Sequence, residues 1–288
     1  MDFAAVVALD FVYAIATLAL ISVGLAIVFG MMRIINLAHG EFMVMGSYSA
    51  AVAVHCHVNI WVAILVIPPV TVAVIGAVIE RVIIRNLYGR MVETMLATWG
   101  LSLFIVGALT MIFGDITEGV PTPLPALTIG AYRTSGYSLF VILMSVVVIL
   151  GVYIILRSSR LGLLARGTMQ NADMAAALGI DTSRIYAVTF AFGAALAGLA
   201  GGILAPVSGV FPTIGASYIG RAFITVIGGG AAPLLGTVSA STLFGFINQL
   251  ATFASNPVYG EVALLLAAIV LIRLLPQGIT GRYFRGSL

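Results

Sequence analysis

A short stretch of this chain places polar and ionisable side chains inside an apolar segment. Residues 33–48 read RIINLAHGEFMVMGSY, so Arg33, Asn36, His39 and Glu41 lie among Ile, Leu, Phe, Met and Val. A charge at the bilayer centre costs about 2.5–3.5 kcal/mol on insertion scales, so such side chains usually face protein or water. Two interpretations follow. The four side chains satisfy one another and exposed backbone around a Gly-containing break, or they line a translocation path.

A second candidate is Arg221, which begins the short segment RAFITVIGGG. A guanidinium can bind the carboxylate of a zwitterionic substrate through two parallel, charge-assisted hydrogen bonds. The same side chain can instead anchor the segment at the membrane interface, or pair with a binding protein outside the membrane. All three roles stay open at this point.

Composition decides the class of protein. The 288 residues are 61% hydrophobic and 8% charged, whereas soluble domains carry about 25% charged residues. All 13 basic residues are Arg; a Walker A loop and a pyridoxal Schiff base each need a Lys, so the chain cannot be a P-loop ATPase by itself. One Cys and three scattered His predict no disulfide, metal site or cofactor. We expect a membrane protein that is not an enzyme and binds no nucleic acid.

The apolar runs predict an all-α, polytopic protein with about eight or nine transmembrane segments. Short or Gly-broken segments in a transporter often mark re-entrant or discontinuous helices near the path. Two of the segments are of this kind: the piece after Arg33 and the stretch 219–231, which is too short to span. The expected segments are 11–30, 39–56, 59–80, 93–113, 138–156, 186–206, 219–231, 233–253 and 260–276.

The positions of the Arg residues predict the orientation. By the positive-inside rule, loops rich in Arg face the cytoplasm, which leaves the loop 114–137 and the N-terminus on the opposite side. The cytoplasmic groups are Arg81, Arg85 and Arg90; Arg157, Arg160, Arg166 and Arg184; and Arg273, Arg282 and Arg285. The segment 189–206 also carries small residues at Ala194, Gly198 and Gly202, a spacing that predicts close approach of a neighbouring helix.

The longest polar segment, 157–185, is too long for a simple turn between two spans. Its centre reads as a short helix from Asp173 to Leu178, which Gly179 ends as a C-terminal cap. A short, exposed, Ala-rich helix suits docking to a partner protein. A surface helix in the headgroup layer is the alternative, and the absence of Trp and Phe argues against it.

These residues resemble known transporters. The AAxxG pattern at Ala175, Ala176 and Gly179 resembles the coupling loop of bacterial ABC importer permeases, although the usual leading Glu is absent and the nearest acid is Asp173. The stretch INLAHGEFMVMGSY resembles the signature of the branched-chain amino-acid permease family, in its LivH-like half. Further matches are ATWGLSL at 97–103, TMQNADMAAALGI at 168–180, GGG at 228–230 with Gly236, and LPQG at 275–278.

The resemblance covers essentially the whole chain and implies an ABC importer permease fold with a single transmembrane domain over 1–288. The implied location is the bacterial inner membrane, with a periplasmic N-terminus and a cytoplasmic C-terminus. The implied partners are a second, LivM-like permease, two cytoplasmic ABC ATPases and a periplasmic solute-binding protein, together with the bilayer. The implied coupling residues are Arg166, Asp173, Ala175, Ala176, Gly179 and Ile180.

Other functions remain to be weighed. An ion-coupled secondary carrier would need a mid-membrane carboxylate, for which Glu41 and Glu261 are the candidates, and it gives the helix at 173–179 no purpose. Urea and short-chain amide permeases share ATWGLSL, TMQN and LPQG, but usually carry an extra N-terminal region. Arg221, Ala222 and Phe223 fit the pattern of amino-acid permeases. Branched-chain or other hydrophobic amino acids are therefore the first expectation and urea or amides the second.

Overall fold

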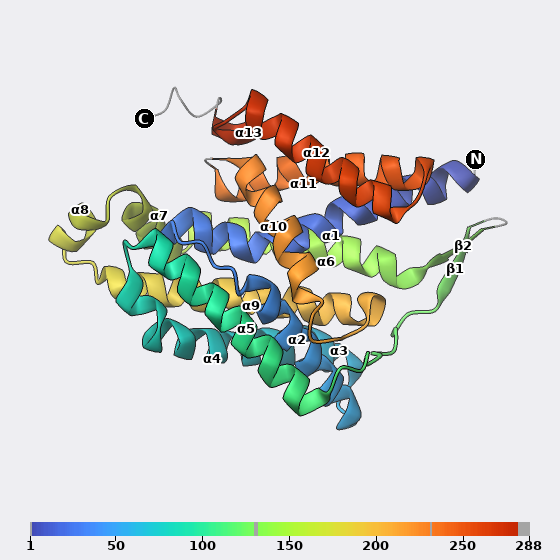
Figure 1. Cartoon of the computed structure of the whole chain (residues 1–288), viewed down its shortest axis with the longest axis horizontal. Coiled ribbons are helices and arrows are strands. Elements are labelled where there is room, and N and C mark those ends of the chain that lie inside the picture. Colours follow the sequence, from blue (N-terminus) through green and yellow to red (C-terminus); the bar gives the residue numbers. More distant parts are fainter. Residues whose placement is uncertain (1, 130–131, 231, 282–288) are drawn as a thin grey trace. The chain divides into compact units, whose positions relative to one another are not determined.

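A computed structural model describes residues 2–129, 132–230 and 232–281 (Figure 1). Within these residues the chain is helical apart from one hairpin, an isolated bridge between Glu118 and Val210, and irregular connections. The helices are α1 (Asp2–Met32), α2 (His39–His55), α3 (Ile60–Leu65), α4 (Ile67–Val82), the 3-10 turn η1 (Ile84–Leu87), α5 (Met91–Phe113), α6 (Gly136–Ser158), α7 (Arg160–Gln170), α8 (Ala172–Ala177), α9 (Thr182–Ser208), α10 (Gly215–Gly229), α11 (Pro233–Ala254), α12 (Pro257–Leu274) and α13 (Gly278–Gly281).

Seven helical segments in the described part of the chain are long and apolar enough to cross a membrane. The shorter α2 and α10 complete the nine expected segments. At 1.5 Å per residue, the 15 residues of α10 span only about 22 Å, less than the ~30 Å hydrocarbon core. The polytopic all-α prediction is confirmed, including the short segment at 219–231.

The structure adds detail to two of the expected segments. The span expected at 59–80 is divided at Val66 into α3 and α4, where Pro68 stands at the start of α4 and cannot donate a backbone hydrogen bond to the preceding turn. The loop 114–137 contains an antiparallel hairpin of β1 (Ala126–Ile129) and β2 (Tyr132–Ser135). Arg282 and Arg285, which were expected in a cytoplasmic tail, lie outside the described residues.

The chain divides into two compact units, which are described separately. One unit consists of residues 1–22, 122–150 and 221–288, and the other of residues 23–121 and 151–220. For brevity they are called the terminal unit and the central unit. The single permease domain expected over 1–288 stays a prediction.

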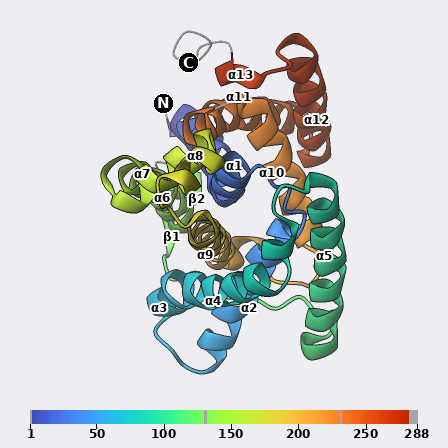
Figure 2. The same cartoon turned by 90° about the vertical axis from the view of Figure 1, so that its left-hand side faces the viewer.

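The central unit is built around α9, with α2 and α4 packed beside it (Figure 2). A Cβ placed on Gly198 would lie 2.5 Å from the carbonyl oxygen of Pro68, and one on Gly202 would lie 2.6 Å from that of Ile64. Ala194 faces Gly76 on α4 in the same row. The small residues at 194, 198 and 202 therefore let α3 and α4 approach α9 closely, as the spacing predicts.

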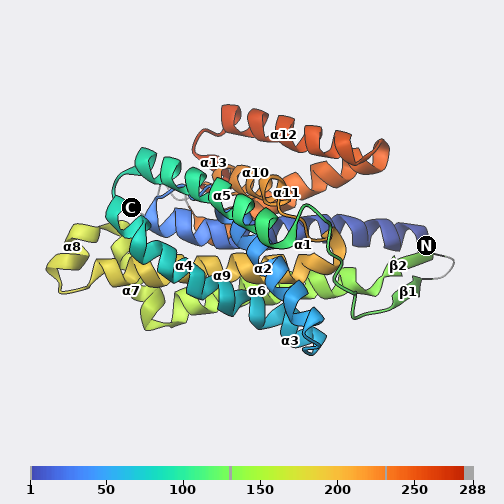
Figure 3. The ribbon, with the colours of Figure 1, turned by 60° about the horizontal axis from the view of Figure 1, so that its bottom comes forward.

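The terminal unit has its own apolar core, in which α11 and α12 form a hairpin (Figure 3). Phe244 is fully buried there among apolar side chains from α1 and α12; the buried members of the core are Leu18, Ala240, Phe244, Leu264, Ala268 and Leu271. The glycines of GGG and LPQG meet in this unit. A Cβ on Gly230 would overlap the carbonyl oxygen of Gln277, and Gly230 and Gly278 both adopt the left-handed conformation that favours glycine.

Candidate functional site

The connection between α1 and α2 folds back alongside α1. A Cβ on Gly24 would lie 3.0 Å from Cε1 of His39, although Gly24 precedes the end of α1 by eight residues, or about 12 Å along the axis. The hydroxyl of Thr98 bonds this connection from α5, seven residues or about 10 Å after that helix begins. The segment 33–38 is therefore re-entrant, which explains why polar residues occur inside an apolar run.

Side chains bond the backbone of this re-entrant segment. Thr98 Oγ1 accepts a hydrogen bond from the amide of Leu37 (3.1 Å), and its one proton is shared between the carbonyls of Ile35 (3.2 Å) and Met95 (3.0 Å). Asn36 Oδ1 accepts from the amide of Ala38 at 3.1 Å. These bonds are needed because non-helical backbone at membrane depth has no water to bind. Asn36 thus bonds the backbone of its own segment, and the choice between the two interpretations stays a prediction.

Glu41 is 2% exposed and lies where the first turns of α2 and α10 meet. A Cβ on Gly40 would overlap the carbonyl oxygen of Gly215, so the two backbones touch there. Glu41 Oε1 would lie 3.0 Å from a Cβ on Gly215, and Ser102 on α5 is within hydrogen-bonding reach of the carboxyl group. The buried Oε2 has no hydrogen-bond partner among the described residues. Helix N-termini favour a carboxylate, which helps Glu41 to remain in this position.

Arg33 does not belong to that buried cluster, which corrects the expectation that all four side chains satisfy one another. Its side chain is exposed, and it forms no ion pair with Glu41 or any other described carboxylate. It adopts φ 54°, a left-handed conformation that is unusual for a residue with a side chain. Whether His39 and Glu41 border a translocation path stays a prediction.

Arg221, in the terminal unit, forms a bidentate ion pair with Glu261 of α12. Its Nε donates to Oε2 of Glu261 at 3.2 Å and its NH2 group donates to Oε1. Both side chains are 38% exposed, so the pair is open to solvent or ligand. Arg221 also borders a cavity of about 180 Å³ whose other polar lining residues are Tyr13, Thr17, Asn248 and Gln249. The sequence placed no partner beside Arg221.

The predicted coupling loop folds as two short helices, each with its own N-terminal cap. Ser159 accepts a hydrogen bond from the amide of Gly162 at the start of α7 (2.9 Å), and Asn171 accepts from the amide of Met174 at the start of α8 (2.9 Å). Asp181 caps α9 in the same way, accepting from the amide of Arg184 at 3.1 Å. The sequence therefore sets the helix boundaries locally, through side chains that favour N-caps.

Gly179 ends α8 as predicted. Its φ is 84°, its amide donates to the carbonyl of Ala176 (2.9 Å), and the amide of Ile180 donates to the carbonyl of Ala175 (3.0 Å). This pair of bonds is a Schellman motif, which a left-handed glycine closes most readily. Arg166 lies on α7, where its Nε donates to the carbonyl of Gly162 at 3.3 Å.

The outer face of α8 differs from the expected one. Ala175 is buried against the protein, whereas Met174, Ala176 and Leu178 are exposed, as is Asp173. Ala175 therefore supports the helix from its inner side and cannot itself meet a partner. Met174 and Leu178 were not among the expected contact residues. Met174 and Leu178 are four residues apart, so they lie on the same side of this short helix.

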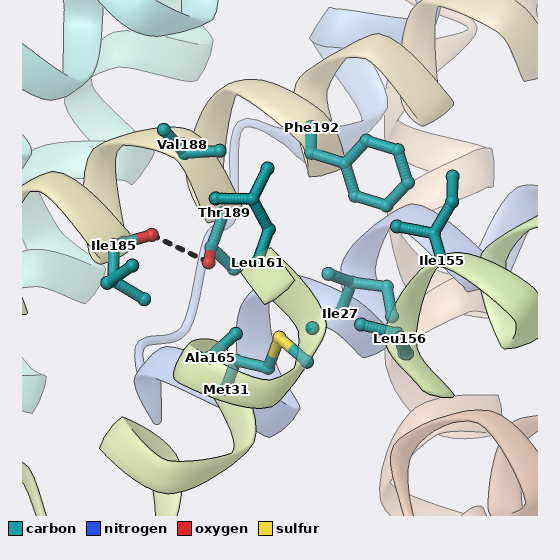
Figure 4. A pocket seen from close by; sticks show the side chains of 11 residues that line it. Ile27, Met31, Ile155, Leu156, Leu161, Ala165, Ile185, Val188, Thr189 and Phe192 are labelled. Carbon is teal, nitrogen blue, oxygen red and sulfur yellow. Dashed lines mark hydrogen bonds between the residues drawn. The ribbon is translucent and has the colours of Figure 1, made fainter. Parts of the chain in front are cut away.

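An apolar pocket of about 90 Å³ lies beneath α7 (Figure 4). Its walls come from α1, the end of α6, α7 and α9; the labelled side chains are Ile27, Met31, Ile155, Leu156, Leu161, Ala165, Ile185, Val188, Thr189 and Phe192. The hydroxyl of Thr189 donates to the carbonyl of Ile185 at 2.7 Å, so this wall presents no unpaired donor. Small movements of α7 over this pocket would break no polar contact in its lining.

Known proteins are similar to this chain over most of its length. A family model described as branched-chain amino acid transport system / permease component matches residues 7–275. The high-affinity branched-chain amino acid transport system permease protein LivH of Escherichia coli (strain K12) is 28% identical, over 93% of this chain and 92% of that protein. BraD of Pseudomonas aeruginosa, described in the same words, has the same identity and coverage.

Two further proteins resemble this chain at lower sequence identity. A probable branched-chain amino acid transport permease protein LivH of Methanocaldococcus jannaschii is 26% identical, over 92% of this chain and 88% of that protein. The solved structure of PsaBC from Streptococcus pneumoniae in complex with Fab has a TM-score of 0.50 and 12% identity, covering 97% of this chain and 94% of that chain. At this identity the likeness shows the fold alone.

Proposed function

The chain belongs to the family of branched-chain amino acid transport permease components, and on this premise we propose that it is the membrane subunit of an ATP-driven importer of branched-chain or other hydrophobic amino acids. The family match over residues 7–275 carries the proposal, because it includes all the described helices except the first few residues of α1 and the short α13. The chain is a multi-pass membrane protein and one component of a larger transporter. The LivH and BraD proteins named above are branched-chain amino acid permeases, which favours amino acids over urea or amides as the proposed substrate.

The rest of the importer would supply the energy. The proposed partners are two cytoplasmic ABC ATPases, a second LivM-like permease and a periplasmic solute-binding protein. The absence of Lys supports a separate ATPase, since a Walker A loop needs that residue. The proposed location is the bacterial inner membrane, with the N-terminus periplasmic and the C-terminus cytoplasmic, on the basis of the Arg-rich loops.

We propose that α8 docks in a groove on an ATPase. Its exposed face offers Met174 and Leu178 as apolar anchors on a helix that capping bonds keep rigid at both ends. Closure of the ATPase pair would move α8 and α7 together, because the chain joins them through the single residue Asn171. The apolar pocket beneath α7 permits that movement without loss of hydrogen bonds, and this would bias the permease between outward- and inward-open states.

One reconstitution tests this function and its coupling. Proteoliposomes that hold the full transporter should take up Leu, Ile and Val with ATP, and an excess of urea should not compete. Ala176→Arg places bulk on the exposed face of α8 without backbone strain and should abolish both uptake and substrate-stimulated ATP hydrolysis. Gly167→Arg on α7 is the matched control, because Gly167 is exposed with open space around it.

The outcomes separate the claims. Uptake that needs no ATP, or that urea competes away, would refute the proposed importer or its substrate. Normal uptake by Ala176→Arg, or equal loss in Gly167→Arg, would refute docking through α8 while leaving the importer intact.

The cavity beside Arg221 is the proposed contact for the substrate during translocation. Arg221 and Glu261 carry opposite charges side by side, and a zwitterionic amino acid carries the complementary pair on its own α-carbon. The carboxylate of the substrate would compete with Glu261 for the guanidinium group of Arg221, and the ammonium group of the substrate would be attracted to Glu261. Exposure of both side chains supports this exchange of partners.

A further inference from the structure

A separate basic pocket occurs in the central unit, where three segments far apart in sequence meet. It has a volume of about 310 Å³ and is lined by Met32, Arg33, Ile34, Tyr88, Gly89, Arg90, Met91 and Tyr186. Met32 ends α1, and the next two residues follow it. The residues 88–90 form the turn before α5, Met91 begins α5, and Tyr186 belongs to the first turns of α9. None of the proposed steps of translocation or ATPase coupling uses this pocket.

The pocket carries two unneutralised positive charges. Arg33 and Arg90 are exposed, and neither guanidinium forms a hydrogen bond or an ion pair with a residue that the structure describes. No carboxylate belongs to the lining. Glu80 is close by, but it is buried and accepts a hydrogen bond from the hydroxyl of Tyr88. Burial, reinforced by this bond to Glu80, raises the pKa of Tyr88 and keeps its phenol neutral.

Three further charges act on the tyrosines of the pocket. Asp173 on α8 acts electrostatically on Tyr186, and Glu80 and Arg85 act on Tyr88. Two carboxylates, Asp173 and Glu80, against three guanidiniums, Arg33, Arg85 and Arg90, leave a net positive site. Arginine is the side chain best suited to a phosphate, because its planar fork matches the phosphate oxygens.

Two left-handed residues and a pair of aromatic rings shape the wall of the pocket. Arg33 has φ 54° and Gly89 has φ 78°, so both basic segments turn through the left-handed region at the pocket wall. A residue with a side chain is strained in that region, and such residues cluster at ligand sites. The rings of Tyr88 and Tyr186 pack edge to face at 4.9 Å and form the third wall.

The surroundings of the pocket are apolar and exposed. Val82 at the end of α4 and Met91, Val92 and Leu96 on the first turns of α5 all show their side chains to the outside. In a multi-pass membrane protein such side chains face acyl chains. A ligand here would therefore meet a positive pocket and an apolar flank together, and basic pockets between transmembrane helices commonly bind anionic lipid headgroups.

We propose that this basic pocket binds the phosphate group of an anionic phospholipid, held between Arg33 and Arg90, with its acyl chains along the exposed side chains of α4 and α5. The bound lipid joins the end of α1, the turn before α5 and the start of α9. It therefore stabilises the closed arrangement of these three segments next to the re-entrant connection. A soluble phosphate ester has the same anionic group but lacks the apolar part.

The test uses the full chain, purified in a non-ionic detergent and stripped of lipid. Phosphatidylglycerol, phosphatidylcholine and inorganic phosphate are titrated separately, and bound lipid is counted by native mass spectrometry alongside the thermal unfolding midpoint. Wild type should prefer phosphatidylglycerol over phosphatidylcholine by about 25-fold, or roughly fivefold for each Arg. Arg90→Gln should reduce this preference to about fivefold, and Arg33→Gln with Arg90→Gln should remove it.

Arg85→Gln is the matched control, because Arg85 is exposed in the same turn but does not line the pocket. Arg85 acts on Tyr88 only through its charge from outside the lining, so this variant should keep more of the preference than Arg90→Gln does. Arg90→Gln also avoids the left-handed position, so misfolding at residue 33 cannot explain its effect. An unchanged preference in the double variant, or an equal loss in Arg85→Gln, overturns the proposal. If inorganic phosphate binds as strongly as phosphatidylglycerol, the pocket binds a soluble anion, and the proposal of a lipid site is refuted.

Discussion

Gly198→Ala tests the packing of the central unit most directly. Gly198 is buried on α9, and the added Cβ would lie 2.5 Å from the carbonyl oxygen of Pro68 and 2.7 Å from Cβ of Val72. Ordinary contact begins at 3.4 Å, so α4 must retreat by about 0.9 Å, the difference of these two distances. Neither neighbouring atom can rotate away, because one belongs to the backbone and the other is attached directly to it.

Two opposed effects decide the magnitude. Forcing one extra carbon into a packed core typically costs about 1–3 kcal/mol. Alanine in a helix regains about 0.5–1 kcal/mol relative to glycine. The net effect of Gly198→Ala is then a loss of up to about 2.5 kcal/mol in the free energy of unfolding.

Gly107→Ala isolates the packing contribution. Gly107 lies within α5 with nothing within 4 Å of its Cβ position, so it should show only the gain in helix propensity. The two variants should therefore differ by about 1–3 kcal/mol, or roughly 5- to 150-fold in the ratio of folded to unfolded protein.

The measurement is the unfolding midpoint of purified full-length protein, read by size-exclusion chromatography after heating. Gly198→Ala should unfold below wild type or close to it, and Gly107→Ala at or above it. If the two variants melt together, α4 is free to move away from α9, and the argument from close approach is wrong.

Three further predictions concern other residues. Thr98→Val should lower the unfolding midpoint, because it leaves the amide of Leu37 and the carbonyl of Ile35 without this partner, at a cost of about 1–3 kcal/mol. Thr98→Ser keeps the hydroxyl and should not lower the midpoint. Equal midpoints of the two variants would contradict the role of Thr98 in bonding the segment 33–38. Arg221→Lys keeps the charge but loses the planar guanidinium that forms two parallel hydrogen bonds, so it should slow amino-acid uptake. Arg221→Gln should slow uptake further. Wild-type uptake by Arg221→Gln would show that Arg221 does not contact the substrate. Cys56 is exposed beyond the end of α2, and a membrane-impermeant maleimide should label it in intact cells whose outer membrane has been permeabilised; labelling only after lysis of the inner membrane would reverse the proposed orientation.

The sequence by itself determined the features that depend on neighbours along the chain. Apolar runs separate the spans, because crossing a bilayer needs a minimum length of apolar helix. Gly179 ends α8 because a left-handed glycine closes the last turn within a few residues. The small residues at 194, 198 and 202 indicated a close helix contact, since backbones can approach only where side chains are small.

Tertiary structure decided which distant residues those local features meet. Thr98 binds Ile35 across 63 residues, and Arg221 pairs with Glu261 across 40. A hydroxyl or a guanidinium at a given position is compatible with many partners, so no spacing along the chain reveals the one that packing brings within reach. The small-residue row could likewise not name α4 as its neighbour. Arg33 stands apart from Glu41, eight residues away, because the backbone turns at Arg33 itself, the left-handed first residue after α1, and only the folded chain sets that turn.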